Sequence, residues 1–166
     1  MSENLTFVFN ANNLFQTSNG LDGEKLNAIN LEIKNEVIIN KEIDGLIIGD
    51  CNIDNLILDN VFWDNGLLIN SNFRNVLFFE VNFRKATLNN SKFINCFFIN
   101  CFFIGSSIET SQFENCIFKN CDFTNIFINN CSFNKTIFSE IILSDSSIIT
   151  NNKSSMICSD FDISFS

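Results

Sequence analysis

A large apolar residue recurs at every fifth position from Ile48 to Ile148, and this period constrains the fold more than any other feature. A helix repeats its apolar face every 3.6 residues and a strand every two. A period of five therefore requires a chain that turns a corner at regular intervals. The positions, called i below, are Ile48, Ile53, Leu58, Trp63, Leu68, Phe73, Phe78, Phe83, Leu88, Phe93, Phe98, Phe103, Ile108, Phe113, Phe118, Phe123, Ile128, Phe133, Phe138, Leu143 and Ile148.

Two neighbouring positions keep the same period. Position i−2 is mostly small or short, with the exceptions Leu46, Leu56, Ile126 and Ile141. Position i+2 is mostly Asn, and Asn, Gly and Asp tolerate a positive φ. In an extended segment i−2 and i point the same way, so both face a core and the chain turns within i+1 and i+2, as in a type II turn. Corners near 90° then give a four-sided coil of 20 residues.

This pattern resembles the pentapeptide-repeat family. The segments that carry the resemblance include 91–95 (SKFIN), 96–100 (CFFIN) and 116–120 (CIFKN). The resemblance implies an all-β fold, a right-handed quadrilateral β-helix. In such a solenoid each coil contacts only the coils next to it. At 20 residues per coil we expect about five coils plus terminal caps.

The repeat divides the chain into three segments. We expect the β-helix over 46–150, an N-terminal cap or irregular first coil over 1–45, and a C-terminal partial coil or tail over 151–166. In the first segment Glu36 and Lys41 occupy position i−2, where a small residue is expected.

Smaller features predict the local structure of the two ends. Phe7 and Phe9 alternate as in a strand, Leu31, Ile33 and Val37 could begin another, and 20–23 (GLDG) predicts a turn. The phase fails at Lys153, and Met156 and Phe161 could resume it.

The composition offers little for catalysis. The chain has no His, which removes the commonest general base. Six of the seven Cys fall at i−2, and we expect them to be buried structural thiols rather than ligands: Cys51, Cys96, Cys101, Cys116, Cys121 and Cys131. We therefore expect no enzyme, no metal and no cofactor.

Charge and hydropathy narrow the partners. The net charge of −9 argues against direct nucleic-acid binding and against an anionic membrane. No apolar run has the roughly 20 residues of a membrane helix, and the start lacks a secretion signal. We expect a cytoplasmic protein.

The outward position i−1 points to an interface. Sorted by the 20-residue coil, one side is apolar in every coil, with Val37 in register before it and two residues at i+1 beside it. These seven residues, called the apolar stripe, are Ile57, Leu77, Phe79, Phe97, Ile99, Ile117 and Ile137. Three interpretations stay open: a homodimer or other protein interface, a terminal segment folded over the stripe, or tolerated exposure.

Two functional hypotheses follow. The first is a non-catalytic protein-interaction or scaffold module that uses the stripe for dimerisation or docking. The second comes from the resemblance, because some pentapeptide-repeat proteins imitate DNA, bind DNA gyrase and related topoisomerases, and protect against quinolones. The acidity is compatible with that hypothesis, but Arg74, Arg84, Lys85 and Lys92 interrupt the acidic track and no inserted loop breaks the coils. Gyrase binding is therefore the weaker alternative.

Overall fold

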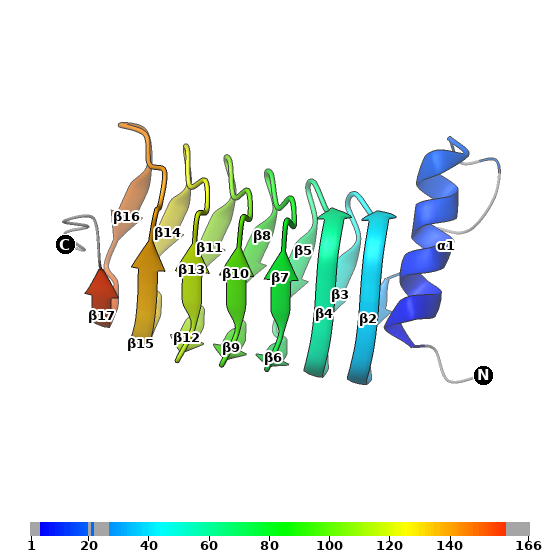
Figure 1. Cartoon of the computed structure of the whole chain (residues 1–166), viewed down its shortest axis with the longest axis horizontal. Coiled ribbons are helices and arrows are strands. Elements are labelled where there is room, and N and C mark those ends of the chain that lie inside the picture. The colour runs from blue at the N-terminus through cyan, green and yellow to red at the C-terminus, as the bar shows by residue number, and fades with distance from the viewer. Residues whose placement is uncertain (1–3, 20, 22–26, 159–166) are drawn as a thin grey trace.

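The chain winds into a straight rod of stacked parallel strands (Figure 1). The computed structural model describes residues 4–19, 21 and 27–158, and of residues 154–158 the backbone alone. Strands in successive coils pair residues twenty apart, as in Phe97↔Ile117 and Ile108↔Ile128. The predicted all-β quadrilateral solenoid with 20 residues per coil is confirmed.

One side of the rod is a seven-stranded sheet, so the chain passes this side seven times and completes six turns. This agrees with the prediction of about five coils plus terminal caps, and the pairing Ala28↔Ile48 shows that residues before 46 already form a coil. The strands of this sheet are β1 (Ala28–Ile29), β3 (Ile47–Gly49), β5 (Leu67–Ile69), β8 (Thr87–Asn89), β11 (Ser107–Glu109), β14 (Phe127–Asn129) and β16 (Ile148–Thr150).

Two further sides share a ten-stranded sheet, in which the longest strands run around the corner between them. Its strands are β2 (Glu32–Glu42), β4 (Asn52–Phe62), β6 (Asn72–Arg74), β7 (Leu77–Phe79), β9 (Lys92–Ile94), β10 (Phe97–Ile99), β12 (Gln112–Glu114), β13 (Ile117–Lys119), β15 (Ser132–Ser139) and β17 (Lys153–Cys158). The fourth side is held by isolated parallel bridges from Phe62 to Ile142.

The corners have the backbone that the sequence predicts. Asn residues at i+2 between Asn55 and Asn130 have φ between 51° and 57°, and Gly105 has 67°. Many of these Asn side chains also bond to the Asn twenty residues away; Asn60 Nδ2 lies 2.7 Å from Asn40 Oδ1. Asn therefore serves the corner twice, through its tolerance of positive φ and through an external hydrogen-bonded ladder.

Aromatic ladders fill the core. Rings at position i stack directly on the ring of the next coil, with centroids 4.8 Å apart for Phe73 and Phe93 and 4.4 Å for Phe98 and Phe118. Each stacked pair contributes about 1 kcal/mol beyond the area it buries. The core continues upstream through Ile33, Ile38 and Ile43, all of which are buried.

The N-terminal end carries a helix, α1 (Leu5–Thr17), so the predicted strand at Phe7 and Phe9 is wrong. Asn4 is the N-cap, and its side chain accepts a hydrogen bond from the Phe7 N–H. Leu5, Val8 and Phe9 follow helical spacing and are buried, whereas Phe7 is exposed. Two Phe residues separated by one residue also fit a helix when only one of them faces the core. Most of the turn predicted at 20–23 lies outside the described residues.

The far end departs from the repeat by one residue. Ile128 pairs with Ile149, so Ile149 packs against the core and Ile148 is exposed. The preceding turn, closed by a hydrogen bond from Ser147 N to Ser144 O, is one residue later than its counterpart from Ile126 N to Phe123 O. The prediction that the phase holds through Ile148 is therefore wrong. β17 pairs in parallel with β15, which places Cys158 rather than Met156 beside Phe138.

Candidate interaction surface

The apolar stripe runs along the rod as predicted from the spacing. Ile57, Leu77, Phe97, Ile117 and Ile137 come from β4, β7, β10, β13 and β15 and pair one above the other. Neighbouring parallel strands are about 4.8 Å apart, so the five side chains form an unbroken column. Because their strand neighbours at position i point into the core, this column points outward.

A second, shorter column lies beside the first. Phe79 pairs with Ile99, and this column ends in Asp59 on one side and Lys119 on the other. Ile57 and Phe97 are 39% and 41% exposed, and the other five stripe residues are half-buried. Upstream, Val37 extends the first column, whereas Ile39 is separated from the second by Asp59; the two are 56% and 47% exposed. The surface is therefore flat, apolar and open to solvent.

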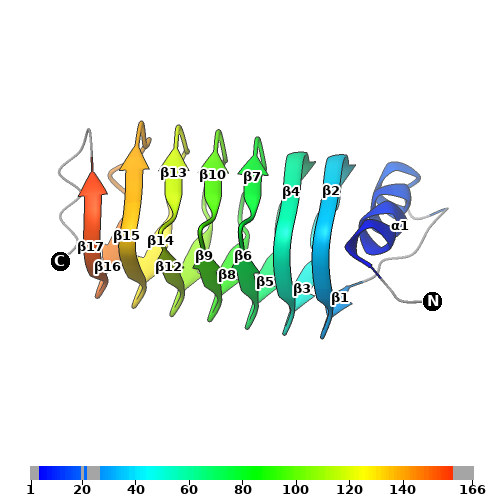
Figure 2. The same ribbon diagram turned by 60° about the horizontal axis from the view of Figure 1, so that its bottom comes forward.

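The helix α1 lies across the N-terminal end of the rod and not along the stripe (Figures 1 and 2). It packs against β2, and Phe9 meets the indole of Trp63 edge-on at a centroid distance of 5.9 Å. The hypothesis that the N-terminal segment covers the stripe is therefore wrong for the described residues of that segment. The residues 159–166 of the other end lie outside the described part.

The fourth side also exposes apolar residues, and the spacing analysis did not assign them to a surface. Phe62, Phe102 and Ile142 are 47%, 45% and 54% exposed. They alternate with Asn82 and Asp122, which are half-buried. These three residues recur every forty residues in the sequence. The spacing alone does not show that they are exposed; their measured exposures do.

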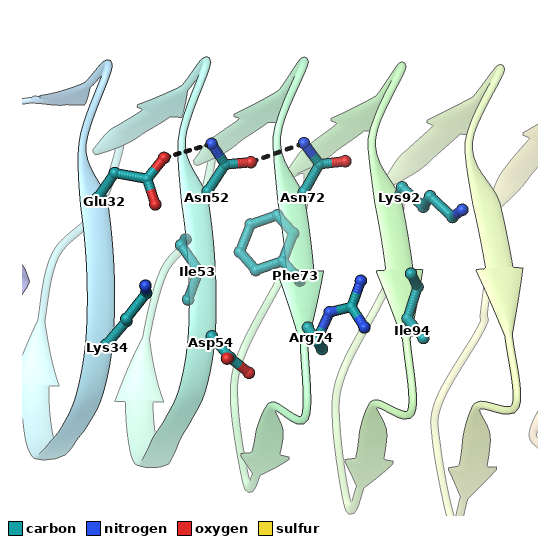
Figure 3. A pocket seen from close by; sticks show the side chains of 10 residues that line it. All are labelled: Glu32, Lys34, Asn52, Ile53, Asp54, Asn72, Phe73, Arg74, Lys92 and Ile94. Carbon is teal, nitrogen blue, oxygen red and sulfur yellow. Dashed lines mark hydrogen bonds between the residues drawn. The ribbon is translucent and has the colours of Figure 1, made fainter.

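The side between the seven-stranded sheet and the apolar stripe is polar. It forms a shallow depression over β4, β6 and β9 (Figure 3). Asn52 Nδ2 donates to Glu32 Oε1 at 2.6 Å, and Asn72 Nδ2 donates to Asn52 Oδ1 at 2.9 Å. The cations Lys34 and Arg74 lie in the same depression as Asp54. Its charges offset one another, and its outward amides are already used in the ladder.

Buried thiols are held by the backbone. Each of the six Cys whose side chain is described is free and buried. Cys131 Sγ donates to Ile108 O at 3.4 Å, and the same geometry recurs at Cys96 and Cys101. Burial raises the pKa of Cys131 to about 11, and burial likewise raises the pKa of Cys96 and Cys101. The thiols of Cys96, Cys101 and Cys131 therefore stay protonated and do not provide a nucleophile at neutral pH.

Within the described part of the chain, no three side chains of His, Cys, Asp or Glu converge on a point where a metal ion could bind. Nor is any helix among those residues long and apolar enough to cross a bilayer.

The fold and the repeat together define the class of protein. A sequence model of the family "Pentapeptide repeats" matches residues 65–93 and 88–125, with eight copies of the repeat. Residues 65–125 therefore carry pentapeptide repeats, and the solenoid is of the kind that pentapeptide-repeat proteins form.

Solved structures with a similar fold share little sequence with this chain. Full-length QnrB1, a plasmid-mediated fluoroquinolone resistance protein, has a TM-score of 0.50 at 10% identity, over 82% of this chain and 86% of that one. A pentapeptide repeat protein from the cyanobacterium Cyanothece 51142 has a TM-score of 0.46 at 8% identity, over 74% of this chain and 90% of that one. HetL of Nostoc sp. strain PCC 7120, involved in heterocyst differentiation regulation, has a TM-score of 0.26 at 10% identity, over 79% of this chain and 89% of that one. No curated protein matches the sequence.

Proposed function

We propose that the chain is a non-catalytic, cytoplasmic protein-interaction module whose apolar stripe docks another protein surface. The observation that carries the proposal is the unbroken outward column from Ile57 to Ile137, in which every coil contributes an apolar side chain. Single exposed apolar residues are ordinary, but a contiguous patch of several hundred Å² on a soluble domain marks an interaction site.

The scaffold suits such a role because the stripe is preformed. Its side chains stand on paired strands above stacked core rings, so binding orders little that is not already ordered. Each apolar Å² that a partner covers contributes about 25 cal/mol before the costs of association are subtracted.

A photo-crosslinking amino acid placed at Phe97 tests the proposal in the cells that naturally make the protein. We expect covalent protein adducts from this position, because it lies at the centre of the stripe. The same amino acid at Gln112, which is exposed on the polar side, is the matched control and should give none. Equal labelling at both positions, or no adduct at Phe97, would contradict the proposal.

The alternative function is imitation of DNA toward gyrase. The net charge of −9 and the fold shared with QnrB1, a fluoroquinolone resistance protein, favour it. The cations Lys34, Arg74 and Lys92 on one polar side weigh against a continuous acidic track. A supercoiling assay with purified gyrase separates the two functions: inhibition, or relief from a quinolone, at micromolar protein supports the alternative, and no effect removes it.

A further inference from the structure

We propose that two pairs of stacked thiols in the core each bind a soft monovalent metal ion, Cu(I), in linear two-sulfur coordination. The pairs are Cys96 with Cys116 and Cys101 with Cys121, and each pair joins two adjacent coils. The inference is independent of the apolar stripe, because these thiols are buried in the core and the stripe points outward.

The register of the coils places the first two thiols one above the other. Cys96 and Cys116 directly precede β10 and β13, which pair in parallel with a shift of twenty residues. Cys96 Sγ lies 3.5 Å from Phe73 O. Cys116 Sγ lies 3.4 Å from Phe93 O, which is again the carbonyl twenty-three residues earlier. The two side chains therefore have the same orientation, and their sulfurs repeat with the spacing of the coils.

The second pair has the same arrangement on the fourth side. Cys101 and Cys121 directly precede two residues that form an isolated parallel bridge. Cys101 Sγ lies 3.4 Å from Phe78 O, and Cys121 Sγ lies 3.3 Å from Phe98 O. In both pairs the two thiols are close enough to interact directly.

The spacing of stacked thiols fits a bridging ion better than a sulfur–sulfur bond. Neighbouring parallel strands are about 4.8 Å apart. Two metal–thiolate bonds of about 2.3 Å, placed in line, span about 4.6 Å. A disulfide instead requires Cβ atoms about 3.8 Å apart, and residues that stack in register keep them one strand spacing apart. An ion between the sulfurs therefore needs little movement of the backbone.

The number of ligands selects the ion. Buried thiols favour the soft ions Cu(I) and Zn²⁺ and iron–sulfur clusters. Structural zinc sites and iron–sulfur clusters take four protein ligands. Among the residues that the structure describes, no three side chains of His, Cys, Asp or Glu converge on one point. A two-coordinate ion needs only a pair of thiols, and Cu(I) is the ion of this group that accepts two sulfurs in line.

The residues above and below each pair limit it to two sulfurs. Val76 and Thr136 occupy the same column in the coils beyond Cys96 and Cys116, and Val81 and Ile141 do so for the other pair. All four are buried, so they close the column at both ends. The chain therefore has a capacity of one Cu(I) for each pair.

Binding exchanges thiol protons for metal. Coordination deprotonates a thiol that is otherwise protonated, and the proton leaves to solvent. Release of one proton for each Cu(I) leaves the pair and its ion neutral together, which a buried site favours. Copper keeps its oxidation state, and the sulfur–hydrogen bond is the bond that breaks. The surrounding core side chains keep water away from the ion.

Copper retention by the full-length chain tests the two sites. Because the thiols are buried in the folded rod, the reduced protein is refolded from urea with Cu(I) in the absence of oxygen and then dialysed against a Cu(I) chelator. We expect one copper ion for each thiol pair, with an X-ray absorption spectrum of two sulfur neighbours. A protein that retains no copper, or a spectrum with three or more sulfur neighbours, overturns the inference.

Serine substitutions identify the ligands. Ser91 and Ser111 are buried at the equivalent position of other coils, so serine fits there and circular dichroism should be unchanged. Cys96→Ser and Cys121→Ser should each halve the copper content, and the double variant should retain none. Cys131→Ser is the matched control, because this buried thiol stacks on Ser111 and not on a second thiol. Equal losses in the control, or full retention in the double variant, would show that the stacked pairs are not the site.

Discussion

At the scale of single residues, the corner position decides how well each coil closes. Positive φ costs an ordinary L-residue about 1 kcal/mol, which Asn and Gly largely avoid. Six corners nevertheless carry other residues with φ between 50° and 55°: Asp50, Glu80, Lys85, Thr110, Lys135 and Glu140. Thr110 is the least suited of them, because a β-branched side chain crowds this backbone conformation.

Thr110→Asn should therefore stabilise the protein by about 1 kcal/mol. The new amide would also sit in the column where Asn90 Nδ2 already donates to Asn70 Oδ1 at 2.7 Å. Chemical denaturation at neutral pH measures the gain. Thr87→Asn, on a strand with ordinary φ, is the control and should give no gain; a stabilisation of equal size there would refute the backbone explanation.

A partly buried carboxyl, that of Asp64, couples stability to pH. Burial, and secondarily the Asp44 carboxylate, raise the pKa of Asp64 above its ordinary value of 3.8, while Arg84 and Lys85 oppose this weakly. A folded-state pKa above the unfolded value means that the folded protein binds the proton more tightly. The charged Asp64 therefore costs stability above its folded pKa, and the cost falls as the pH drops through that pKa toward 3.8.

Asp64→Asn should consequently raise the free energy of unfolding at neutral pH by about 0.5 kcal/mol, since the group is partly solvated. The advantage should shrink on acidification, because the wild-type carboxyl then gains its own proton. Urea titrations from pH 7 downward follow the difference. Asp145→Asn, on an exposed turn, serves as the control, and a gain that grows with acidification would show the sign to be wrong.

At the scale of elements, α1 covers the open strand edge of the first coil. Stacked strands leave unpaired backbone groups at the end of a solenoid, where another chain could add. Here Asn13 Oδ1 accepts from the Glu42 N–H at 2.8 Å, and Gln16 Nε2 donates to Asp44 O at 2.9 Å. Glu36, which breaks the small-residue rule at i−2, accepts hydrogen bonds from the backbone N–H groups of Leu5 and Thr6. The exception to the repeat is thus the residue that binds the helix N-terminus.

Glu36→Ala should destabilise the protein by about 2 kcal/mol, because two helix N–H groups lose a charged acceptor in a partly buried place. Hydrogen exchange should accelerate in α1 and β2 before the distal coils respond. Glu32→Ala removes an exposed carboxylate that accepts a hydrogen bond from the Asn52 side chain, and it should cost less than about 0.5 kcal/mol. Similar losses in both variants would argue against a docking role for Glu36.

The same elements show how far sequence alone reaches. Period five predicts the four sides, the buried Cys and the apolar stripe, because each depends only on which way a residue points in a repeating coil. It does not predict α1, since a short segment with Phe7 and Phe9 satisfies strand and helix patterns until Leu5 and Val8 have a surface to cover. Nor does it predict the slip before Ile149, which arises from one additional turn residue among Ser144, Ser146 and Ser147. Exposure of the stripe depends on where α1 lies, which is a tertiary fact.

At the scale of the whole molecule, the rod is a one-dimensional stack in which each coil touches only its neighbours. Ring contacts make this concrete: Phe93 lies 4.8 Å from both Phe73 and Phe113 in the adjoining coils. A complete coil should therefore be removable, provided that the phase of every later residue is kept.

Deletion of residues 92–111 removes twenty residues and joins Ser91 to Gln112, which follows the same column as Lys92. We expect this variant to fold into a shorter solenoid with strand-type circular dichroism and cooperative unfolding at a lower temperature, since one layer of core rings is lost. Deletion of 92–110 removes nineteen residues and shifts every later side chain by one position. Alternation then turns core residues such as Phe113 outward, and the C-terminal coils cannot stack on the N-terminal ones. The two variants separate register from length, because the nineteen-residue deletion retains more of the protein and should nevertheless fail to fold. Two variants of equal stability would mean that the twenty-residue register does not hold the rod together.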